Sequence, residues 1–293
     1  MTAENGPRRN DGQAAAAGPA SSRVAGWPGA NGQGTRQNSV PALAVTDASI
    51  AFGPLRAVDR MSFQLDPGGM LGLIGPNGAG KTTMFNLIAG SLKPDSGTIA
   101  IGGVPVQSEA ASRRISRGLA RTFQIPRPFA GMTVLENMLT APQGQTGERL
   151  LGNLVRLKDV RRQERAAIER AEELLEFLQL SRLAGEEARV LSGGQRKLLE
   201  LGRAMMAEPQ IILLDEPAAG VNPSLLDFII DRIAAINARG ITVLLIEHNM
   251  DMIKRLCGRV LVMASGRLLA EGAPQDVSRD PAVIEAYLGG APA

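Results

Sequence analysis

Cysteine, histidine and aromatic side chains are scarce in this 293-residue chain, which has one Cys, one His and only 3% Phe, Trp and Tyr. The single Cys257 cannot form an internal disulfide, so a disulfide-stapled domain is excluded and a reducing cytosol is expected. No run of about 18 consecutive apolar residues occurs, which leaves no segment able to span a bilayer as a helix. The first residues also lack the charged and apolar regions of a signal peptide.

Neither sign of charge is in excess, since 32 basic residues stand against 29 acidic ones and the net charge is +3. This balance gives no reason to expect a nucleic acid partner. With 44% hydrophobic and 21% charged residues, the chain can form one large globular domain or two small ones. The same composition excludes disordered and collagen-like proteins.

The first 40 residues differ from the rest, because 28 of them are Gly, Ala, Ser, Pro, Asn or Gln. We predict a disordered tail over residues 1–40. Its four arginines leave open a weak contact with anionic lipid, although a solvated tail is the simpler interpretation. The folded domain is expected over residues 41–290, followed by a short C-terminal tail at residues 291–293.

Apolar periodicity predicts an α/β fold for the folded domain. A two-residue period marks half-buried strands near its start, and short continuous apolar runs mark buried strands further on. Helical patterns alternate with the buried strands, as in a parallel sheet with crossover helices. The predicted strands cover residues 43–52, 61–65, 70–74, 211–214, 241–246, 260–263 and 267–271. The predicted helices cover residues 82–89, 153–180, 198–206 and 281–288.

A glycine-rich loop, Gly-Pro-Asn-Gly-Ala-Gly-Lys-Thr at residues 75–82, lies between a predicted strand and a predicted helix. Its glycines let the backbone wrap around phosphates at a helix N-terminus, while Lys81 supplies a point charge and Thr82 a ligand for Mg²⁺. A chance glycine-rich turn would not also place Lys-Thr between strand and helix. In this phosphate loop and just after it, the expected contacts come from Gly75, Asn77, Gly78, Ala79, Gly80, Lys81, Thr82 and Thr83.

A later buried strand ends in two acids, Asp215 and Glu216. Carboxylates there are costly to bury without a partner. We expect Asp215 to face the Mg²⁺ shell and Glu216 to accept a proton from an attacking water. The alternative is a negatively charged helix start, because Pro217 follows the pair.

The segment Leu-Ser-Gly-Gly-Gln at residues 191–195 opens a predicted helix, where it can bind an anion or act as an ordinary cap. Together with the phosphate loop and the acid pair, it resembles the signature of the ATP-binding subunits of ABC transporters. The resemblance covers about residues 42–290. It implies a P-loop NTPase of the ABC ATPase type, with a parallel sheet core, an antiparallel β subdomain and a helical subdomain at about residues 125–190. It also implies that Ser192, Gly193, Gly194 and Gln195 complete the ATP site of a partner subunit.

The resemblance assigns roles to four further residues. Gln124 matches a glutamine that touches Mg²⁺ and the attacking water, and His248, the only histidine, matches one that contacts the γ-phosphate. Phe52 matches an aromatic residue that stacks on adenine, with Val58 as a neighbour. Taken alone, Gln124 suits an exposed loop equally well, and Phe52 suits the core. The expected catalytic residues are Lys81, Gln124, Glu216 and His248, and the expected metal ligands are Thr82, Gln124 and Asp215.

Several local motifs are similar to those of the branch that imports branched-chain amino acids, among them Arg-Thr-Phe-Gln at residues 121–124. This resemblance implies an ATPase at the cytoplasmic face of the inner membrane, paired with an identical or sister ATPase. It implies that permease subunits dock beside residues 125–134, and that a substrate-binding protein outside the membrane acts indirectly. Asn222 stands where many relatives have aspartate, which leaves the communication between two ATP sites open.

Other functions remain as alternatives. Urea, amides or aromatic acids are other cargoes of related branches, and lipid or polysaccharide exporters use the same fold. An ATP-driven nucleic-acid or ribosome protein is disfavoured, because the chain has one set of motifs and no long coiled-coil insert. A non-catalytic interaction module is disfavoured by the intact Lys81, Glu216 and His248.

Overall fold

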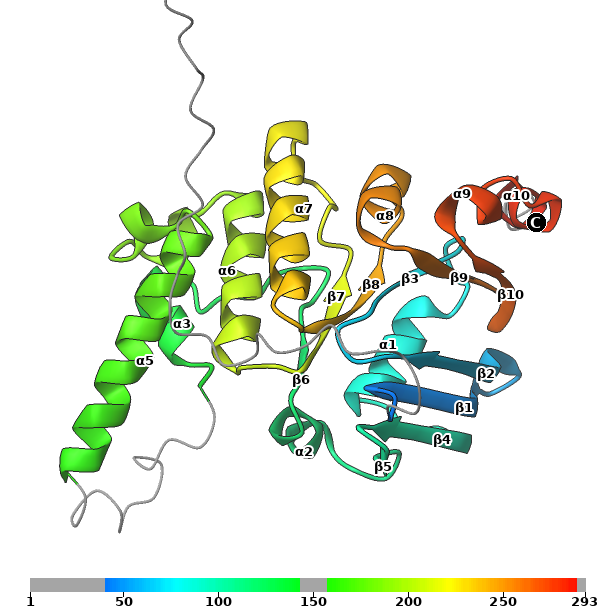
Figure 1. Cartoon of the computed structure of the whole chain (residues 1–293), viewed down its shortest axis with the longest axis horizontal. Helices are drawn as coiled ribbons and strands as arrows, with labels where there is room; N and C mark the ends of the chain where they lie inside the picture. The colour runs from blue at the N-terminus through cyan, green and yellow to red at the C-terminus, as the bar shows by residue number, and fades with distance from the viewer. Residues whose placement is uncertain (1–39, 143–156, 289–293) are drawn as a thin grey trace, which may run out of the picture. The chain divides into compact units, whose positions relative to one another are not determined.

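The computed structural model of this chain describes residues 40–142 and 157–288. The predicted tails, residues 1–40 and 291–293, lie outside the described residues except for Val40. Within the described ranges, no helix is long and apolar enough to cross a membrane. Two sheets and the helices that pack on them make up this part of the chain (Figure 1).

The first sheet is antiparallel, with the strand order β2-β1-β4-β5. Its strands are β1 (Leu43–Phe52), β2 (Leu55–Leu65), β4 (Ser96–Ile101) and β5 (Val104–Pro105). Alternate side chains such as Leu43, Val45 and Met61 are at most 2% exposed, which confirms the predicted two-residue period. The strand predicted at residues 61–65 begins earlier, at Leu55, because β2 pairs with β1 directly after a two-residue turn.

The second sheet has the order β10-β9-β3-β8-β7-β6 and is parallel except for its edge strand β10. Its strands are β3 (Met70–Ile74), β6 (Leu119–Arg121), β7 (Ile211–Asp215), β8 (Thr242–Ile246), β9 (Arg259–Ala264) and β10 (Arg267–Gly272). Every residue of β7 and β8 is buried, as expected for parallel strands covered on both faces. The predicted parallel sheet is confirmed, and β6 adds an edge strand that was not predicted.

One helix, α1 (Lys81–Ala89), holds the two sheets together. Its apolar side chains, Phe85 among them, are fully buried in a single cluster with alternate residues of both sheets. Burying one side chain of this size contributes about 1.5–3 kcal/mol. On the other face of the parallel sheet lie α6 (Gly193–Met206), α7 (Pro223–Ala238) and α8 (Met250–Leu256) (Figure 1). Three further helices are α2 (Ala111–Ser116), α9 (Pro274–Val277) and α10 (Pro281–Leu288).

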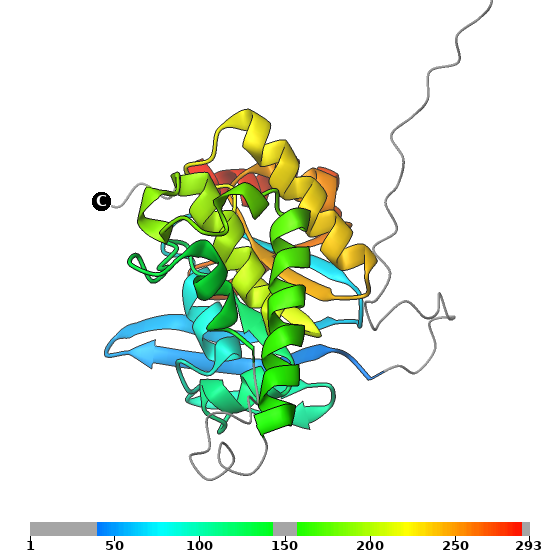
Figure 2. The same ribbon diagram turned by 90° about the vertical axis from the view of Figure 1, so that its left-hand side faces the viewer.

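A helical layer forms beside α6, where α3 (Val134–Leu139) and α5 (Leu157–Phe177) pack against it and each other (Figure 2). Two single 3₁₀ turns follow α5, at Ser181–Leu183 and Ala188–Val190. The predicted helix is confirmed over Leu157–Phe177, and its buried face carries Ala171, Leu174 and Leu175, which are at most 1% exposed, whereas Ile168 is 38% exposed. The helix ends before residue 180 because Gln179 has a φ of +56°, the left-handed conformation that terminates helices.

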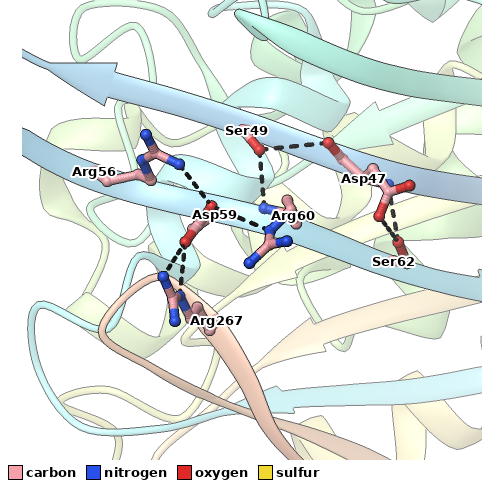
Figure 3. A network of polar contacts seen from close by, with 7 residues as sticks. All are labelled: Asp47, Ser49, Arg56, Asp59, Arg60, Ser62 and Arg267. Carbon is pink, nitrogen blue, oxygen red and sulfur yellow. Dashed lines mark hydrogen bonds and ion pairs between the residues drawn. The ribbon is translucent and has the colours of Figure 1, made fainter.

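A buried aspartate connects the two sheets beside the phosphate loop (Figure 3). The Asp59 side chain on β2 is 2% exposed, and it lies 3.1 Å from Arg56 Nη1 and 2.7 Å from Arg267 Nε on β10. Arg60 Nε lies 3.8 Å from the same carboxylate. The hydrogen bond from Arg56, joined by one from Arg267, holds the pKa of Asp59 below its ordinary value against the opposing effect of burial.

The backbone of Asp59 continues this connection to the phosphate loop. Its amide donates to Gly266 O at 2.8 Å, and the Gly266 amide donates to Ala79 O at 3.1 Å. Gly266 lies in the turn between β9 and β10, so the turn is held between β2 and the phosphate loop. These hydrogen bonds therefore fix the antiparallel sheet to the parallel sheet beside the end of the phosphate loop, where α1 begins.

We expect Asp59→Asn to destabilise the fold at neutral pH and to have little effect in acid. Because the pKa of Asp59 is lowered in the folded state, its ion pairs contribute stability above the unfolded pKa of about 3.9, and that stability is lost as the pH falls through the folded value. Urea midpoints of wild type and variant should differ at about pH 7, and the difference should shrink as the pH falls below about 3.9, the unfolded pKa, toward the lowered folded value.

The matched control for this experiment is Asp66→Asn, an exposed aspartate just after the same strand. Its urea midpoint should follow that of wild type across the same pH range. A constant gap between wild type and Asp59→Asn from neutral pH into acid would contradict the ion-pair explanation.

Candidate nucleotide-binding and hydrolysis site

The phosphate loop joins β3 to α1 and packs tightly on neighbouring backbone. A Cβ atom at Gly75 would lie 2.1 Å from Met263 O, and one at Gly80 would lie 2.2 Å from Ala57 O. Both glycines also have positive φ, +145° and +98°. Any side chain at these two positions would push the loop away from β9 and β2, so the glycines are required by packing as well as by conformation.

Lys81 begins α1 and is only 6% exposed. Its ammonium group donates to Gly75 O at 2.7 Å and to Pro76 O at 2.8 Å. Burial lowers the pKa of Lys81, while the carboxylates of Glu216 and Asp215 oppose that shift. The loop carbonyls thus hold a positive charge near both members of the acid pair.

Three of the predicted catalytic side chains meet although they are far apart in the sequence. Gln124 Nε2 donates to Glu216 Oε2 at 2.6 Å, and His248 Nε2 lies 3.2 Å from Glu216 Oε1. Gln124, Glu216 and His248 follow the adjacent parallel strands β6, β7 and β8, so they share one edge of the sheet. This convergence favours a common site over an isolated loop glutamine and a histidine without a role.

Glu216 does not begin a helix. Its φ is +47°, a value that non-glycine residues adopt rarely and that is typical of functional sites. The next helix, α7, begins at Pro223, where Asn222 is the cap and accepts a hydrogen bond from Leu225 N at 2.9 Å. The interpretation of the acid pair as a charged helix start is therefore wrong.

Asp215 ends β7 and is 4% exposed. Burial raises its pKa, and the hydrogen bond from Arg121, whose Nη2 lies 2.9 Å from Asp215 Oδ2, opposes that rise. Thr82, Gln124 and Asp215 line one groove of about 750 Å³. Hydroxyl, amide and carboxylate oxygens are the ligands that Mg²⁺ prefers, so these residues fit the ion.

Protein ligands alone would not complete such a magnesium site. Within residues 40–142 and 157–288, His, Cys, Asp and Glu side chains form no group of three or more that could hold a metal ion. Mg²⁺ ordinarily binds one or two carboxylates together with substrate phosphates and water. The groove beside Asp215 is therefore suited to Mg²⁺ that arrives with a nucleotide.

A second buried acid, Glu247, was not predicted as a site residue. It is 2% exposed and accepts backbone hydrogen bonds from Ala218 N at 2.6 Å, His248 N at 2.9 Å and Asn249 N at 3.0 Å. Glu247 therefore joins the segment after Glu216 to the segment that carries His248. Its position directly after a buried strand, like that of Asp215, was the signal available in the sequence.

The segment at residues 191–195 opens a helix as predicted: α6 begins at Gly193, and Ser192 is its N-cap. Ser192 Oγ accepts from Gln195 N at 3.3 Å, and Gln195 Oε1 accepts from Ser192 N at 2.9 Å, which is a capping box. A Cβ atom at Gly194 would lie 2.0 Å from Leu225 Cδ2, whereas one at Gly193 would meet nothing within 4 Å. The described structure therefore explains Gly194 by packing on α7 and leaves the surface at Gly193 open.

Phe52 and Val58, the two residues predicted beside adenine, differ in accessibility. Phe52 at the end of β1 is 48% exposed, so the alternative that it belongs to the core is wrong. Val58 is 0% exposed and belongs to the apolar cluster around α1. Its side chain has no surface to offer a nucleotide, because β2 must fill the space between the first sheet and α1.

Two family models match the chain. The ABC transporter model matches residues 58–219, and the branched-chain amino acid ATP-binding cassette transporter model matches residues 267–293. The probable branched-chain amino acid transport ATP-binding protein LivG of Archaeoglobus fulgidus is 39% identical over 249 residues, which are 84% of this chain and 95% of that protein. The high-affinity LivG of Escherichia coli is 39% identical over 252 residues, 86% of this chain and 99% of that protein.

Solved structures agree with these relatives. A nucleotide-free ATP-binding cassette from an ABC transporter has a TM-score of 0.74 and 38% identity, over 84% of this chain and 98% of that one. The ADP conformation of MJ1267, an ATP-binding cassette of an ABC transporter, has a TM-score of 0.73 and 37% identity, over 85% of this chain and 99% of that one. The predicted fold class, family and ATPase activity are confirmed. The chain belongs to the ATP-binding subunits of ABC transporters, in the branched-chain amino acid branch, and is an ATPase whose hydrolysis is coupled to transport.

Proposed function

We propose that ATP binds between Phe52 and the phosphate loop, and that Glu216 is the base of its hydrolysis. The observation that carries this assignment is the convergence of Gln124 and His248 on the Glu216 carboxylate, at 2.6 and 3.2 Å. The exposed ring of Phe52 offers a stacking surface to adenine, and the amides of Gly75 and of residues 77–83 face the phosphates together with the ammonium group of Lys81.

The chain's own groups divide the work of hydrolysis. Glu216 takes the proton from the attacking water, His248 orients that water and the γ-phosphate, and Gln124 holds the carboxylate in place. Lys81 stabilises the charge that develops on the phosphate oxygens. Thr82, Gln124 and Asp215 would hold Mg²⁺, which would supply further neutralisation of phosphate charge.

The assembly that we propose contains two ATPase subunits facing head to tail. In it, Ser192, Gly193, Gly194 and Gln195 of each subunit complete the ATP site of an identical or sister subunit. The open surface at Gly193 supports this arrangement. ATP then stabilises the closed dimer over the open one, because its γ-phosphate contacts both subunits only when the dimer is closed. Hydrolysis removes this contact and with it the preference for the closed dimer. One ABC ATPase domain over residues 41–290, with a helical subdomain at about 125–190, carries all of these residues.

As an ABC transporter ATPase the chain works with transmembrane permeases, and we propose that they dock in the groove beside Gln124. The groove of about 750 Å³ that holds Gln124 is also lined by Phe123 and Ile125, which are 56% and 69% exposed. Large apolar side chains exposed together mark a protein contact. We propose that the chain lies at the cytoplasmic face of the inner membrane, with a substrate-binding protein acting from the other side.

We propose leucine, isoleucine and valine as the cargo. Support comes from the relatives named as branched-chain amino acid transport proteins and from the family match at residues 267–293. Urea, amides, aromatic acids or a lipid are the alternatives, since the ATPase itself does not touch the cargo.

The base is tested by Glu216→Gln. We expect ATP turnover at saturating Mg²⁺-ATP to fall by about 10²–10⁴-fold, because the amide cannot accept the proton, while binding of ATP is retained. Lys81→Ala is the comparison, and it should weaken binding itself. Turnover by Glu216→Gln at the wild-type rate would overturn the assignment.

The cargo is tested by uptake of labelled leucine, urea, short amides and aromatic acids in source cells that carry wild type or Lys81→Ala. Selective loss of leucine uptake is expected, because Lys81→Ala impairs ATP binding and hydrolysis in this subunit and leaves the permeases unchanged. Lys93→Ala, at an exposed position outside the site, should retain uptake. If leucine uptake persisted and another compound were lost, that compound would be the cargo.

A further inference from the structure

Two charged side chains of α6 reach the loops that carry the hydrolysis residues. Lys197 Nζ donates to the main-chain oxygen of Glu216 at 2.6 Å. Glu200 Oε1 accepts a hydrogen bond from Phe123 N, the residue just before Gln124. Lys197 and Glu200 are three residues apart, so they lie one above the other on the same face of the helix.

Both side chains are held in a poorly solvated place. Glu200 is 9% exposed, and burial raises its pKa, while burial lowers the pKa of Lys197 against the nearby carboxylates of Glu247, Glu200, Glu216 and Asp215. Burying a charge is costly unless it forms good hydrogen bonds. In each case the side chain forms a hydrogen bond with a backbone group of a hydrolysis loop. This bond offsets part of the cost of burying the charge and at the same time holds the loop in place.

The backbone that Lys197 holds is strained. Glu216 has a φ of +47°, and its oxygen also accepts from Ala219 N at 3.1 Å while its own amide donates to Ile246 O at 2.9 Å. Such a conformation persists only where its surroundings determine it. Loss of the Lys197 bond would leave the Glu216 carbonyl held by the longer bond from Ala219 N, which weakens the hold on this backbone and on the carboxylate attached to it.

Glu200 acts on Gln124, the residue that contacts the Glu216 carboxylate. Its bond to Phe123 N fixes the backbone immediately before Gln124, whose side chain donates to the Glu216 carboxylate at 2.6 Å. The loop after β6 is largely exposed to solvent, at Phe123, Gln124 and Ile125. One helix therefore anchors both residues of the Gln124–Glu216 contact.

We propose that Lys197 and Glu200 are positioning residues that hold Glu216 and Gln124 in the geometry required for ATP hydrolysis. Neither side chain needs to touch the nucleotide. Because both extend from α6, a displacement of this helix, whose first residues are Ser192 to Gln195, moves both anchors together. The inference rests on the proposed role of Glu216.

The test compares ATP turnover by the purified full-length chain with side chains that keep or lose the hydrogen bond. Lys197→Met and Glu200→Leu should each lower kcat by about tenfold or more and leave the KM for ATP within about twofold, since misplacement of a catalytic group affects the chemical step. Lys197→Arg and Glu200→Gln, which keep a donor and an acceptor, should recover most of the rate. Lys254→Met, at an exposed position on α8, controls for loss of a lysine charge.

A double-mutant cycle shows whether Lys197 acts through Glu216. Adding Lys197→Met to Glu216→Gln should reduce the remaining rate by less than about twofold, because the group being positioned is already disabled. An equal loss in both backgrounds, or a raised KM with unchanged kcat, would overturn the inference. If Glu216→Gln itself were fully active, the proposed function would fail instead.

Folding of each variant is followed by its urea midpoint. Should Lys197→Met fail to fold, the comparison of Lys197→Arg with Lys197→Gln decides, because glutamine is too short to reach the Glu216 oxygen. Equal turnover by these two variants would contradict the inference, and a selective loss in Lys197→Gln would support it.

Discussion

The parallel pairing of β3, β8, β7 and β6 is the constraint on which the site depends. In this register Leu73 lies opposite Ile246, and Ile246 lies opposite Asp215, so the ends of these strands are level. Residues that follow the strands therefore meet at one edge, although Gln124 and His248 lie 124 positions apart in the chain. The meeting of Gln124 and His248 at Glu216 is a direct result.

Buried charged side chains also lie at this edge of the sheet, and each has a different kind of ion-pair or hydrogen-bond partner. Asp215 pairs with an arginine side chain, Lys81 with loop carbonyls, and Glu247 with three backbone amides. An unpaired charge in these places would cost several kcal/mol. Because the partners are mostly main-chain groups, these side chains determine loop conformation and electrostatics at the same time.

The antiparallel sheet contributes to the same site from outside the parallel core. It carries the exposed Phe52, and its strand β2 supplies the Ala57 oxygen that closely approaches Gly80. Asp59 and the turn at Gly266 fix this sheet to the phosphate loop. The proposed adenine surface and the proposed phosphate loop thus belong to one continuous set of contacts, with the buried α1 beneath them.

The sequence by itself determined the local elements and the chemistry of the motifs. The apolar runs of β3, β7 and β8 and the identity of Lys81, Glu216 and His248 could be read because strand period and loop composition are local properties. Only the tertiary structure decided that Val58 is buried and that Lys197, Glu247 and Asp59 position the site. Their partners are distant in sequence or are backbone groups, and no local pattern records which carbonyl or amide a side chain will meet.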